Sequence, residues 1–224
     1  MREADALRAA YDGVSAAIAP LSPMELLAPT RCHGWTVADL VHHLTEDARR
    51  ALVALATPAE APATSTFVTY WSSRPEPAPD WEGAERAAAA SAWAGRRAAS
   101  VAREPGLLVE LWLSTSVAAV HAALAASPSA LAGTQGQVLT VPDLLTTLAT
   151  EAVIHHLDLL LGLPPAPEPA VSTLDGLLTL HGLAARPADW DIEDYLLKGT
   201  GRLALSTADR TALGPAAGFF PLLG

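Results

Sequence analysis

Apolar residues recur along most of the chain at spacings of three and four, which is the pattern of amphipathic helices. The two-residue alternation of strands is nearly absent, and alanine and leucine, two strong helix formers, dominate. The pattern therefore predicts an all-α protein. Long helices are expected over residues 2–19, 34–57, 80–103, 107–127 and about 141–161, and short ones over 22–28, 171–185, 191–201 and 206–214.

The expected helix ends carry local signals. Thr36 is placed to cap the helix that follows it, and Asp39 suits the positive end of that helix dipole. Thr140 is placed in the same way before the last long helix, with Pro142 tolerated in its first turn. Gly162 suits the position just beyond the last turn of that helix. These signals predict where both helices begin.

Two segments are expected to lack regular structure. Residues 57–80 are rich in Pro, Ala, Ser and Thr and predict a long loop. The aromatic residues Phe67, Tyr70 and Trp71 favour a loop laid on the protein surface over a disordered one. The stretch that begins TQGQ at residue 134 predicts a turn leading into the last long helix.

Composition and charge narrow the class of protein. The chain has 224 residues, 50% of them hydrophobic, which allows a sizeable core without disulfides. The formal net charge of −10 argues against nucleic acid and against an anionic membrane surface as partners. The single cysteine, Cys32, excludes an internal disulfide and indicates a reducing compartment. Neither a signal peptide nor an apolar stretch of membrane-spanning length is evident, so we expect a cytoplasmic protein.

The segment EAVIHHLDL, residues 151–159, places titratable groups in the most apolar of the predicted helices. Glu151 and His155 are four residues apart and lie about 40° from each other on one helix face, which Asp158 continues. Burial of a carboxylate is costly unless the group is paired or bound to a metal. Carboxylate and neutral imidazole both suit zinc and related divalent ions, so Glu151 and His155 form half of a candidate metal site.

The helix capped by Thr36 offers a third ligand, at His42 or His43. His43 lies about 60° from the apolar residue Leu40 on the helix circumference and His42 about 160°, so His43 is the better inward ligand. Three protein ligands leave a coordination position open for water or a thiol, as in catalytic zinc sites. The same spacing also occurs on solvated helices and in buried polar networks, so it does not by itself decide between these interpretations.

Other residues give weaker signals. Cys32 and His33 lack a local partner for metal binding, and a small buried thiol is the expected role of Cys32. His121 and His181 stand alone and are expected to be packing or surface residues. Trp35 is expected to staple the start of the helix that follows it, and the other tryptophans to pack in the core or an interface. No glycine-rich phosphate loop, C-x-x-C pair or G-x-S-x-G elbow is present.

Two motifs resemble those of a known family. CHGWTVADLVHHL, residues 32–44, resembles the W-T-V-x-D-L-x-x-H-L signature of the DinB-like superfamily and is most similar to the branch named after mycothiol-dependent maleylpyruvate isomerase. EAVIHHLDL resembles the second signature of that branch, E-x-x-x-H-x-x-D. DYLLKGTGR, residues 194–202, resembles a segment found further downstream there. The resemblance covers most of the chain.

The resemblance implies a four-helix bundle with a divalent metal near one end, held by His43, Glu151 and His155. It also implies an enzyme of the thiol S-transferase or isomerase type. Such an enzyme uses a low-molecular-weight thiol such as mycothiol, whose thiolate the metal stabilises for attack on an electrophilic small molecule. Zinc is the expected metal, and nickel, iron and manganese tolerate the same ligands. Asp158 and His156 are candidates for groups that hydrogen-bond a metal-ligating side chain and fix its orientation.

The expected organisation is a metal-binding bundle over residues 1–165, followed by a short helical extension over 166–224 that packs on it. In the isomerase a separate C-terminal domain contributes to the active site, whereas here only short predicted helices follow the second motif. Two other classes stay open: a non-catalytic, metal-stabilised bundle that binds a small ligand or a partner, and a metal-dependent hydrolase. The apolar, Ala-rich bundle surface is compatible with a homodimer.

Overall fold

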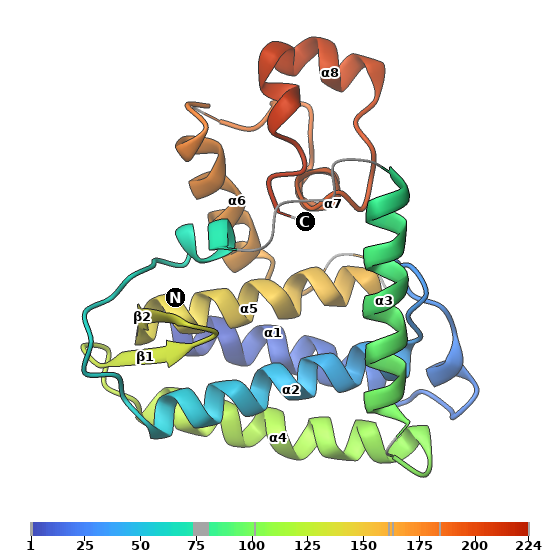
Figure 1. Ribbon diagram of the computed structural model, residues 1–224, viewed down its shortest axis with the longest axis vertical. Helices are drawn as coiled ribbons and strands as arrows, with labels where there is room; N and C mark the ends of the chain where they lie inside the picture. The colour runs from blue at the N-terminus through green and yellow to red at the C-terminus, as the bar shows by residue number, and fades with distance from the viewer. Residues whose placement is uncertain are drawn as a thin grey trace.

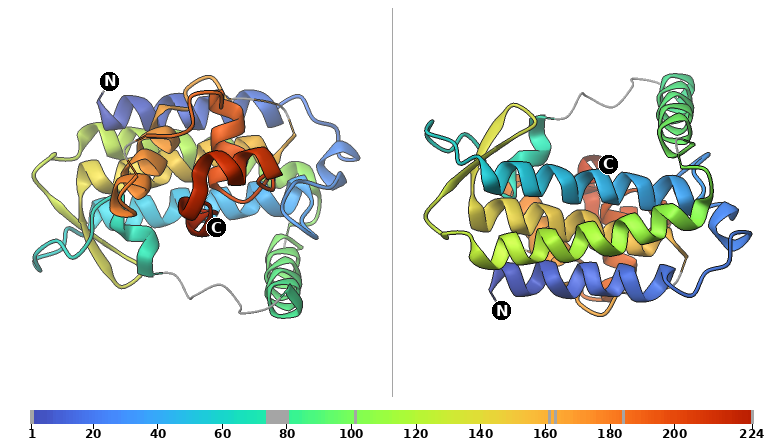
Figure 2. Two further views of the ribbon diagram at one scale, coloured as in Figure 1. Left: turned by 90° about the horizontal axis from the view of Figure 1, so that it is seen from above. Right: turned by 90° about the horizontal axis from the view of Figure 1, so that it is seen from below.

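The computed structural model describes residues 2–73, 81–100, 102–160, 162, 164–183 and 185–223. Four long helices lie side by side and form the body of the protein (Figures 1 and 2). Helices α1 and α2 each contact both α4 and α5, so the core lies between all four. The helices are α1 (Glu3–Ile18), α2 (Val37–Ala56), α4 (Pro105–Ala125) and α5 (Val141–Asp158). The predicted mostly helical fold is confirmed.

The two helices that carry the candidate ligands begin at the predicted caps. At the start of α2 the Thr36 hydroxyl accepts the Asp39 backbone N–H, and the Thr36 backbone N–H donates to the Asp39 carboxylate at 2.9 Å. At the start of α5 the Thr140 hydroxyl accepts the backbone N–H of Asp143 at 3.2 Å. These bonds satisfy N–H groups that have no partner within the helix, and so they define the first turn of each helix.

A β-hairpin precedes α5, and the sequence analysis did not predict it. Strand β1 (Leu131–Thr134) pairs antiparallel with β2 (Gln137–Thr140), and the structure contains no other sheet among the residues it describes. The two turn residues, Gln135 and Gly136, have positive φ angles of 49° and 78°. Positive φ at both central residues is the geometry of a type I′ turn, which usually carries Asn-Gly or Asp-Gly. The all-α prediction is therefore corrected at this one place.

The segment between α2 and α4 differs in detail from its prediction. Residues 57–73 are largely irregular apart from a short 3₁₀ helix, η2 (Thr69–Ser73), in which the Trp71 side chain is buried rather than at the surface. The rest of the predicted loop, 74–80, lies outside the described residues. The next helix, α3 (Trp81–Ala99), contacts α2 and stands outside the bundle (Figure 1). Pro105, which lies between the helices predicted over 80–103 and 107–127, is the first residue of α4, a position that tolerates proline.

The C-terminal segment folds back over the bundle. Its elements are short helices that lie above α5 in Figure 1: α6 (Glu168–Leu180), α7 (Ile192–Gly199), α8 (Thr207–Leu213) and the 3₁₀ helix η3 (Gly214–Phe219). The backbone N–H groups of Leu222 and Leu223 donate to the Gly199 carbonyl at 2.8 and 3.0 Å, which returns the chain to α7. Near the N-terminus the predicted short helix over 22–28 is the 3₁₀ helix η1 (Glu25–Leu27). The division of the chain at residue 165 stays a prediction.

Asp209 joins the last helices through buried hydrogen bonds. Its carboxylate accepts the indole N–H of Trp190 at 2.7 Å, the ammonium of Lys198 at 3.1 Å, and the backbone N–H and hydroxyl of Ser206, each at 2.8 Å. Burial alone would raise the pKa of this carboxyl, but the bonds from Ser206, Trp190 and Lys198 outweigh it and hold the pKa below its ordinary value of 3.8.

We expect Asp209→Asn to destabilise the protein at neutral pH by an amount that shrinks in acid. Because the folded-state pKa is lowered, the stability contributed by the carboxylate is fully present above pH 3.8 and is lost as the pH falls through the folded-state value. Urea unfolding of both proteins between pH 7 and the acid range measures the difference in unfolding free energy. A difference that stays constant below pH 3.8 would contradict this assignment.

Helix α4 is apolar on its exposed side as well as its buried side, with Leu107, Leu113 and Val117 exposed. Among the described residues it is the one helix long and apolar enough to cross a membrane by length and composition, a test that core helices of soluble proteins also pass. In the structure α4 packs against α1 and α2. The homodimer stays a prediction.

Candidate metal centre

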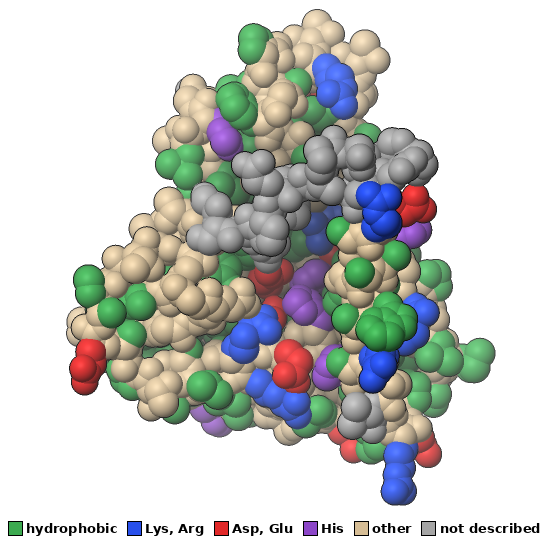
Figure 3. Space-filling view, viewed as in Figure 1, with side chains coloured by type: hydrophobic (Ala, Val, Ile, Leu, Met, Phe, Trp, Pro, Cys, Tyr) green, Lys and Arg blue, Asp and Glu red, His purple; other side chains and the backbone are tan. Residues whose placement is uncertain are grey.

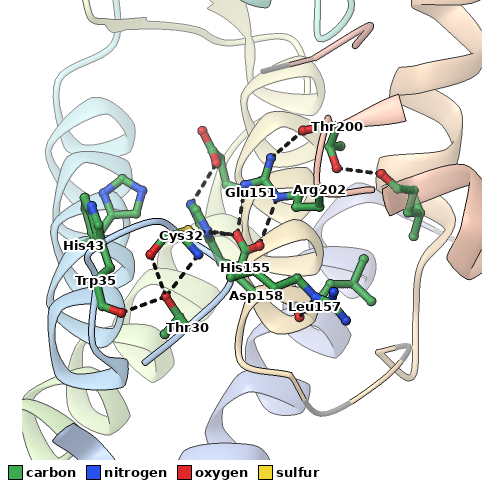
Figure 4. Close-up of polar contacts among 12 residues, drawn as sticks. Thr30, Cys32, Trp35, His43, Glu151, His155, Leu157, Asp158, Thr200 and Arg202 are labelled. Carbon is green, nitrogen blue, oxygen red and sulfur yellow. Dashed lines mark hydrogen bonds and ion pairs between the residues drawn. The ribbon is translucent and has the colours of Figure 1, made fainter. Parts of the chain in front are cut away.

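The structure brings the two sequence motifs together at one end of α2 and α5. One ligand atom from each of His43, Glu151 and His155 lies within 4.8 Å of the other two. His155 Nε2 is 3.4 Å from Glu151 Oε2, and the His43 and His155 rings meet edge to face with centroids 4.9 Å apart. Figure 4 shows Glu151 and His155 along α5, with His43 facing them from α2. The helical-wheel preference for His43 over His42 agrees with this placement.

The Asp158 carboxylate is hydrogen-bonded to His155. The fully buried Asp158 carboxylate lies 2.9 Å from His155 Nδ1, one helical turn along α5. Arg202 reaches the same carboxylate from the C-terminal segment, with Nε 3.0 Å from Oδ1 and Nη2 2.9 Å from Oδ2. The Cys32 thiol donates to Oδ2 at 3.2 Å. With Nδ1 directed at Asp158, Nε2 of His155 is directed at Glu151, the arrangement typical of histidine ligands to metals.

The charges of this group reinforce one another. Burial would raise the pKa of Asp158, but hydrogen bonds from His155 and Arg202 lower it well below its ordinary range, so the carboxylate is ionised. Burial would lower the pKa of His155, but its hydrogen bonds to Asp158, Cys32 and Glu151 raise it well above 6.5. A proton and a metal ion compete for the same imidazole nitrogen. The surrounding carboxylates therefore favour positive charge at His155, whether it comes from a proton or from a metal ion.

A cavity of about 390 Å³ opens over the three candidate ligands. Figure 3 shows histidine, acidic and basic side chains gathered in a hollow beside α3. Residues from four separate parts of the chain meet here: Cys32, His33, Trp35 and His43; Ala88 and Ser91; Glu151, Ile154 and His155; Arg202 and Leu223. The cavity therefore combines polar groups at its base with apolar walls, as small-molecule sites commonly do.

The other lining residues were not assigned to the site from the sequence, among them Cys32, Trp35 and Arg202. Cys32 was expected to be buried, but it is half-buried and borders the cavity. Trp35 was expected to staple the start of α2, yet its indole lies edge to face with the His43 ring at a centroid distance of 5.6 Å and lines the cavity. Arg202 belongs to the quoted DYLLKGTGR segment, whose likeness to the family was the one available signal for it.

His33 borders the cavity, and the four other histidines that are not candidate ligands lie elsewhere. His42 and His156 are absent from the residues that line this cavity. His156 is buried with its Nδ1 beside Gly13, which turns it toward α1, and burial lowers its pKa. His121 lines a separate cavity between α1 and α4, and His181 stacks on Phe219 with ring centroids 4.4 Å apart. The orienting role considered for His156 stays a prediction.

Two sets of side chains have the spacing of metal ligands. Besides His43, Glu151 and His155, the ligand atoms of Cys32, His155 and Asp158 also lie within 4.8 Å of one another. The second set is the weaker candidate, because both oxygens of Asp158 already accept hydrogen bonds from the Arg202 cation, which repels a second positive charge. In the first set, the 3.4 Å between His155 Nε2 and Glu151 Oε2 equals the roughly 3.4 Å that separates ligands about 2.1 Å from a tetrahedral zinc.

The fold and this site define a helical bundle that gathers two histidines and a glutamate below an open cavity. A family model described as the mycothiol maleylpyruvate isomerase N-terminal domain matches residues 7–160, a range that contains all three side chains. The chain belongs to this family.

Other comparisons give the following results. A comparison with curated proteins finds no match. Two solved structures are similar to the chain: the crystal structure of the mycothiol-dependent maleylpyruvate isomerase, with a TM-score of 0.48, and that of a point mutant of this isomerase, with a TM-score of 0.49. Each is 19% identical to this chain and covers 77% of it. The chain in turn covers 66% of the length of each isomerase chain.

Proposed function

We propose that this protein is a divalent-metal-dependent enzyme that uses a low-molecular-weight thiol, of the mycothiol type, against an electrophilic small molecule. His43, Glu151 and His155 are the proposed metal ligands, with zinc as the first choice of metal. The single observation that carries the proposal is the meeting of these three groups, from α2 and α5, below an open cavity. Membership of the mycothiol maleylpyruvate isomerase N-terminal domain family supports the class of chemistry.

A divalent cation, when bound, supplies positive charge that favours the thiolate form of a thiol over the neutral form. The residues of the chain provide the setting for that chemistry. Asp158 and Arg202 together orient His155, because the Asp158 carboxylate accepts hydrogen bonds from both His155 and Arg202. Trp35, Ile154 and Leu223 give the cavity apolar walls that exclude water from the reacting groups.

The cavity also indicates the charge of the substrate. Arg202 lines the cavity while it is paired with Asp158, and a guanidinium has five N–H donors, more than Asp158 and the Thr200 carbonyl use. The unused donors favour a substrate that carries an anionic or strongly accepting group. A small, polar, soluble substrate is consistent with the proposed cytoplasmic location.

Metal content tests the ligand set. We expect wild-type protein, purified without a His-tag or chelator and incubated with zinc, to retain about one zinc per chain, the count of a single three-ligand site. His43→Ala should lose it, since two remaining ligands bind a cation far more weakly. His42→Ala is the matched control, because the neighbouring histidine does not line the cavity. Atomic emission of dialysed samples gives the ratio, and circular dichroism shows that each variant is folded.

The outcomes separate the proposal from its alternatives. Equal zinc in wild-type protein and His43→Ala, or zinc in neither, would refute the ligand set. With cobalt in place of zinc, a new sulfur-to-cobalt absorption band on addition of thiol supports the thiol-dependent enzyme. A bound metal whose spectrum ignores thiols points to the non-catalytic bundle, and turnover of ester or amide substrates without thiol points to the hydrolase.

A further inference from the structure

Helix α3 closes one side of the cavity although it is not part of the bundle. Ala88 and Ser91 of α3 line the cavity together with His155 and Arg202. Figure 1 shows α3 standing across the ends of the long helices, and Figure 3 shows the hollow directly beside it. The wall of the cavity that faces the candidate ligands is therefore supplied by a separate helix.

Helix α3 contacts the loop that precedes α2. The Arg96 guanidinium donates a hydrogen bond to the Gly34 carbonyl, and its Nε lies 3.8 Å from the buried Asp39 carboxylate. Gly95 packs on the Trp35 indole so closely that a Cβ added there would lie 3.3 Å from the ring. This contact places α3 at a set distance from Trp35, which itself lies against His43.

The face of α3 that is turned to the loop and the cavity is made of small side chains. Ala88, Ser91, Ala92 and Gly95 recur at spacings of three and four, so they share one side of the helix. Ala92 is buried against Gly34, where an added Cβ on the glycine would lie only 3.0 Å from the Ala92 methyl group. Ala88 and Ser91 instead border empty space, since they are the two α3 residues that line the cavity. Their short side chains leave its volume open.

We propose that Ala88 and Ser91 determine which thiols and electrophiles reach the metal position, by setting the width of the cavity on its α3 side. The inference rests on the proposed function, because it assigns a size limit to the ligands of that same site. A branched side chain at either position extends into the cavity, whereas the metal ligands on α2 and α5 are untouched. Access and metal binding are therefore separable.

Leucine substitutions on the two faces of α3 test the proposal. Ala88→Leu and Ser91→Leu fill the cavity side, and Ala90→Leu is the matched control because Ala90 is exposed and lines no cavity described for this structure. Each protein is loaded with cobalt and titrated with 2-mercaptoethanol, a small thiol, and with glutathione, a bulky one. We expect the sulfur-to-cobalt band to appear with both thiols in wild-type protein and in Ala90→Leu.

In Ala88→Leu and Ser91→Leu we expect unchanged cobalt content and unchanged binding of 2-mercaptoethanol. Glutathione should bind about tenfold or more weakly, because the leucine side chain occupies space that the bulky thiol needs. Equal weakening in Ala90→Leu, or no selective loss of glutathione in either cavity variant, would overturn the size limit. Two cavity variants are used so that a folding defect in one of them leaves the other informative.

A second pair of ligands keeps this result distinct from that of the proposed function. If no thiol perturbs the cobalt spectrum of the wild-type protein, the thiol-dependent function fails, and access is measured with imidazole and 4-phenylimidazole instead. Selective loss of the phenyl derivative in the cavity variants then supports the size limit on its own, and equal binding of both ligands refutes it. A wild-type protein that binds no cobalt overturns both proposals.

Discussion

Asp158→Ala should unfold at a much lower urea concentration than the wild-type protein, with a loss of about 3–5 kcal/mol in unfolding free energy. Asp158 is fully buried, and its removal leaves the Arg202 guanidinium, itself mostly buried, without the carboxylate that it contacts through two N–H groups. The Nδ1 of His155 and the thiol of Cys32 lose the same acceptor. An uncompensated buried charge is among the largest single-residue costs in a folded protein.

The comparison for this variant is Asp5→Ala, which removes an ion pair with Arg2 at the exposed start of α1. We expect a loss below about 1 kcal/mol there, because solvent screens such pairs. Both variants are measured in the presence of a chelator, so that the difference reports on the fold alone. A loss for Asp158→Ala as small as that for Asp5→Ala would show that the buried network contributes little to stability.

Substitution of Asp158 has a second expected effect, on metal affinity. Loss of the group that accepts a hydrogen bond from a histidine ligand typically weakens metal affinity about 10–100-fold. We therefore expect the zinc affinity of Asp158→Asn to be about 10–100-fold lower than that of the wild-type protein. Asparagine keeps the shape of the side chain and can still accept from His155 Nδ1, so its effect on zinc should be milder than that of alanine. Competition with a chromogenic chelator measures both affinities. Unchanged affinity in both variants would remove Asp158 from the proposed site.

Trp112→Ala should cost about 3–5 kcal/mol in unfolding free energy, the typical range for a buried tryptophan. Trp112 lies in the centre of the bundle on α4 with no exposed surface. Its ring packs edge to face against Tyr11 at a centroid distance of 5.0 Å, and its indole N–H donates to the Ser15 hydroxyl at 2.9 Å. The substitution therefore opens a cavity at the contact between α1 and α4 and also removes a hydrogen bond.

Trp93→Ala provides the matched control for this prediction. Trp93 is 63% exposed on α3, where it packs only loosely under the Arg97 guanidinium. We expect a loss below about 1 kcal/mol, the range of exposed cation–π contacts. Chemical denaturation followed by circular dichroism avoids the loss of the fluorescent probe itself. Equal losses for the two tryptophans would contradict the placement of the core between the four long helices.

The parts of the fold that sequence reasoning predicted are those that depend on neighbouring residues. The caps at Thr36 and Thr140 act on groups three residues away, so the pattern of side chains was enough to place the starts of α2 and α5. The hairpin before α5 was missed because Gln135-Gly136 lacks the Asn or Asp that usually marks a type I′ turn. Its two short strands are also too brief to show a clear alternation.

The candidate ligands could also be predicted from the sequence, because their positions on the helix faces follow from local spacing. Glu151 and His155 share a helix face by their spacing, and helical periodicity preferred His43 to His42 as the inward-facing side chain. Spacing alone left solvated and metal-free interpretations open, and the resemblance to the family made the assignment specific.

What the sequence by itself determined is the class of fold, the helix starts and the faces on which the histidines and carboxylates lie, because all of these follow from hydrogen bonds and spacings within a few residues. Only the tertiary structure decided what surrounds them. Cys32 contacts Asp158 across 126 residues and Arg202 contacts it across 44, and Ala88 of α3 closes the far wall. Such neighbours depend on how whole helices pack, which no local pattern along the chain specifies.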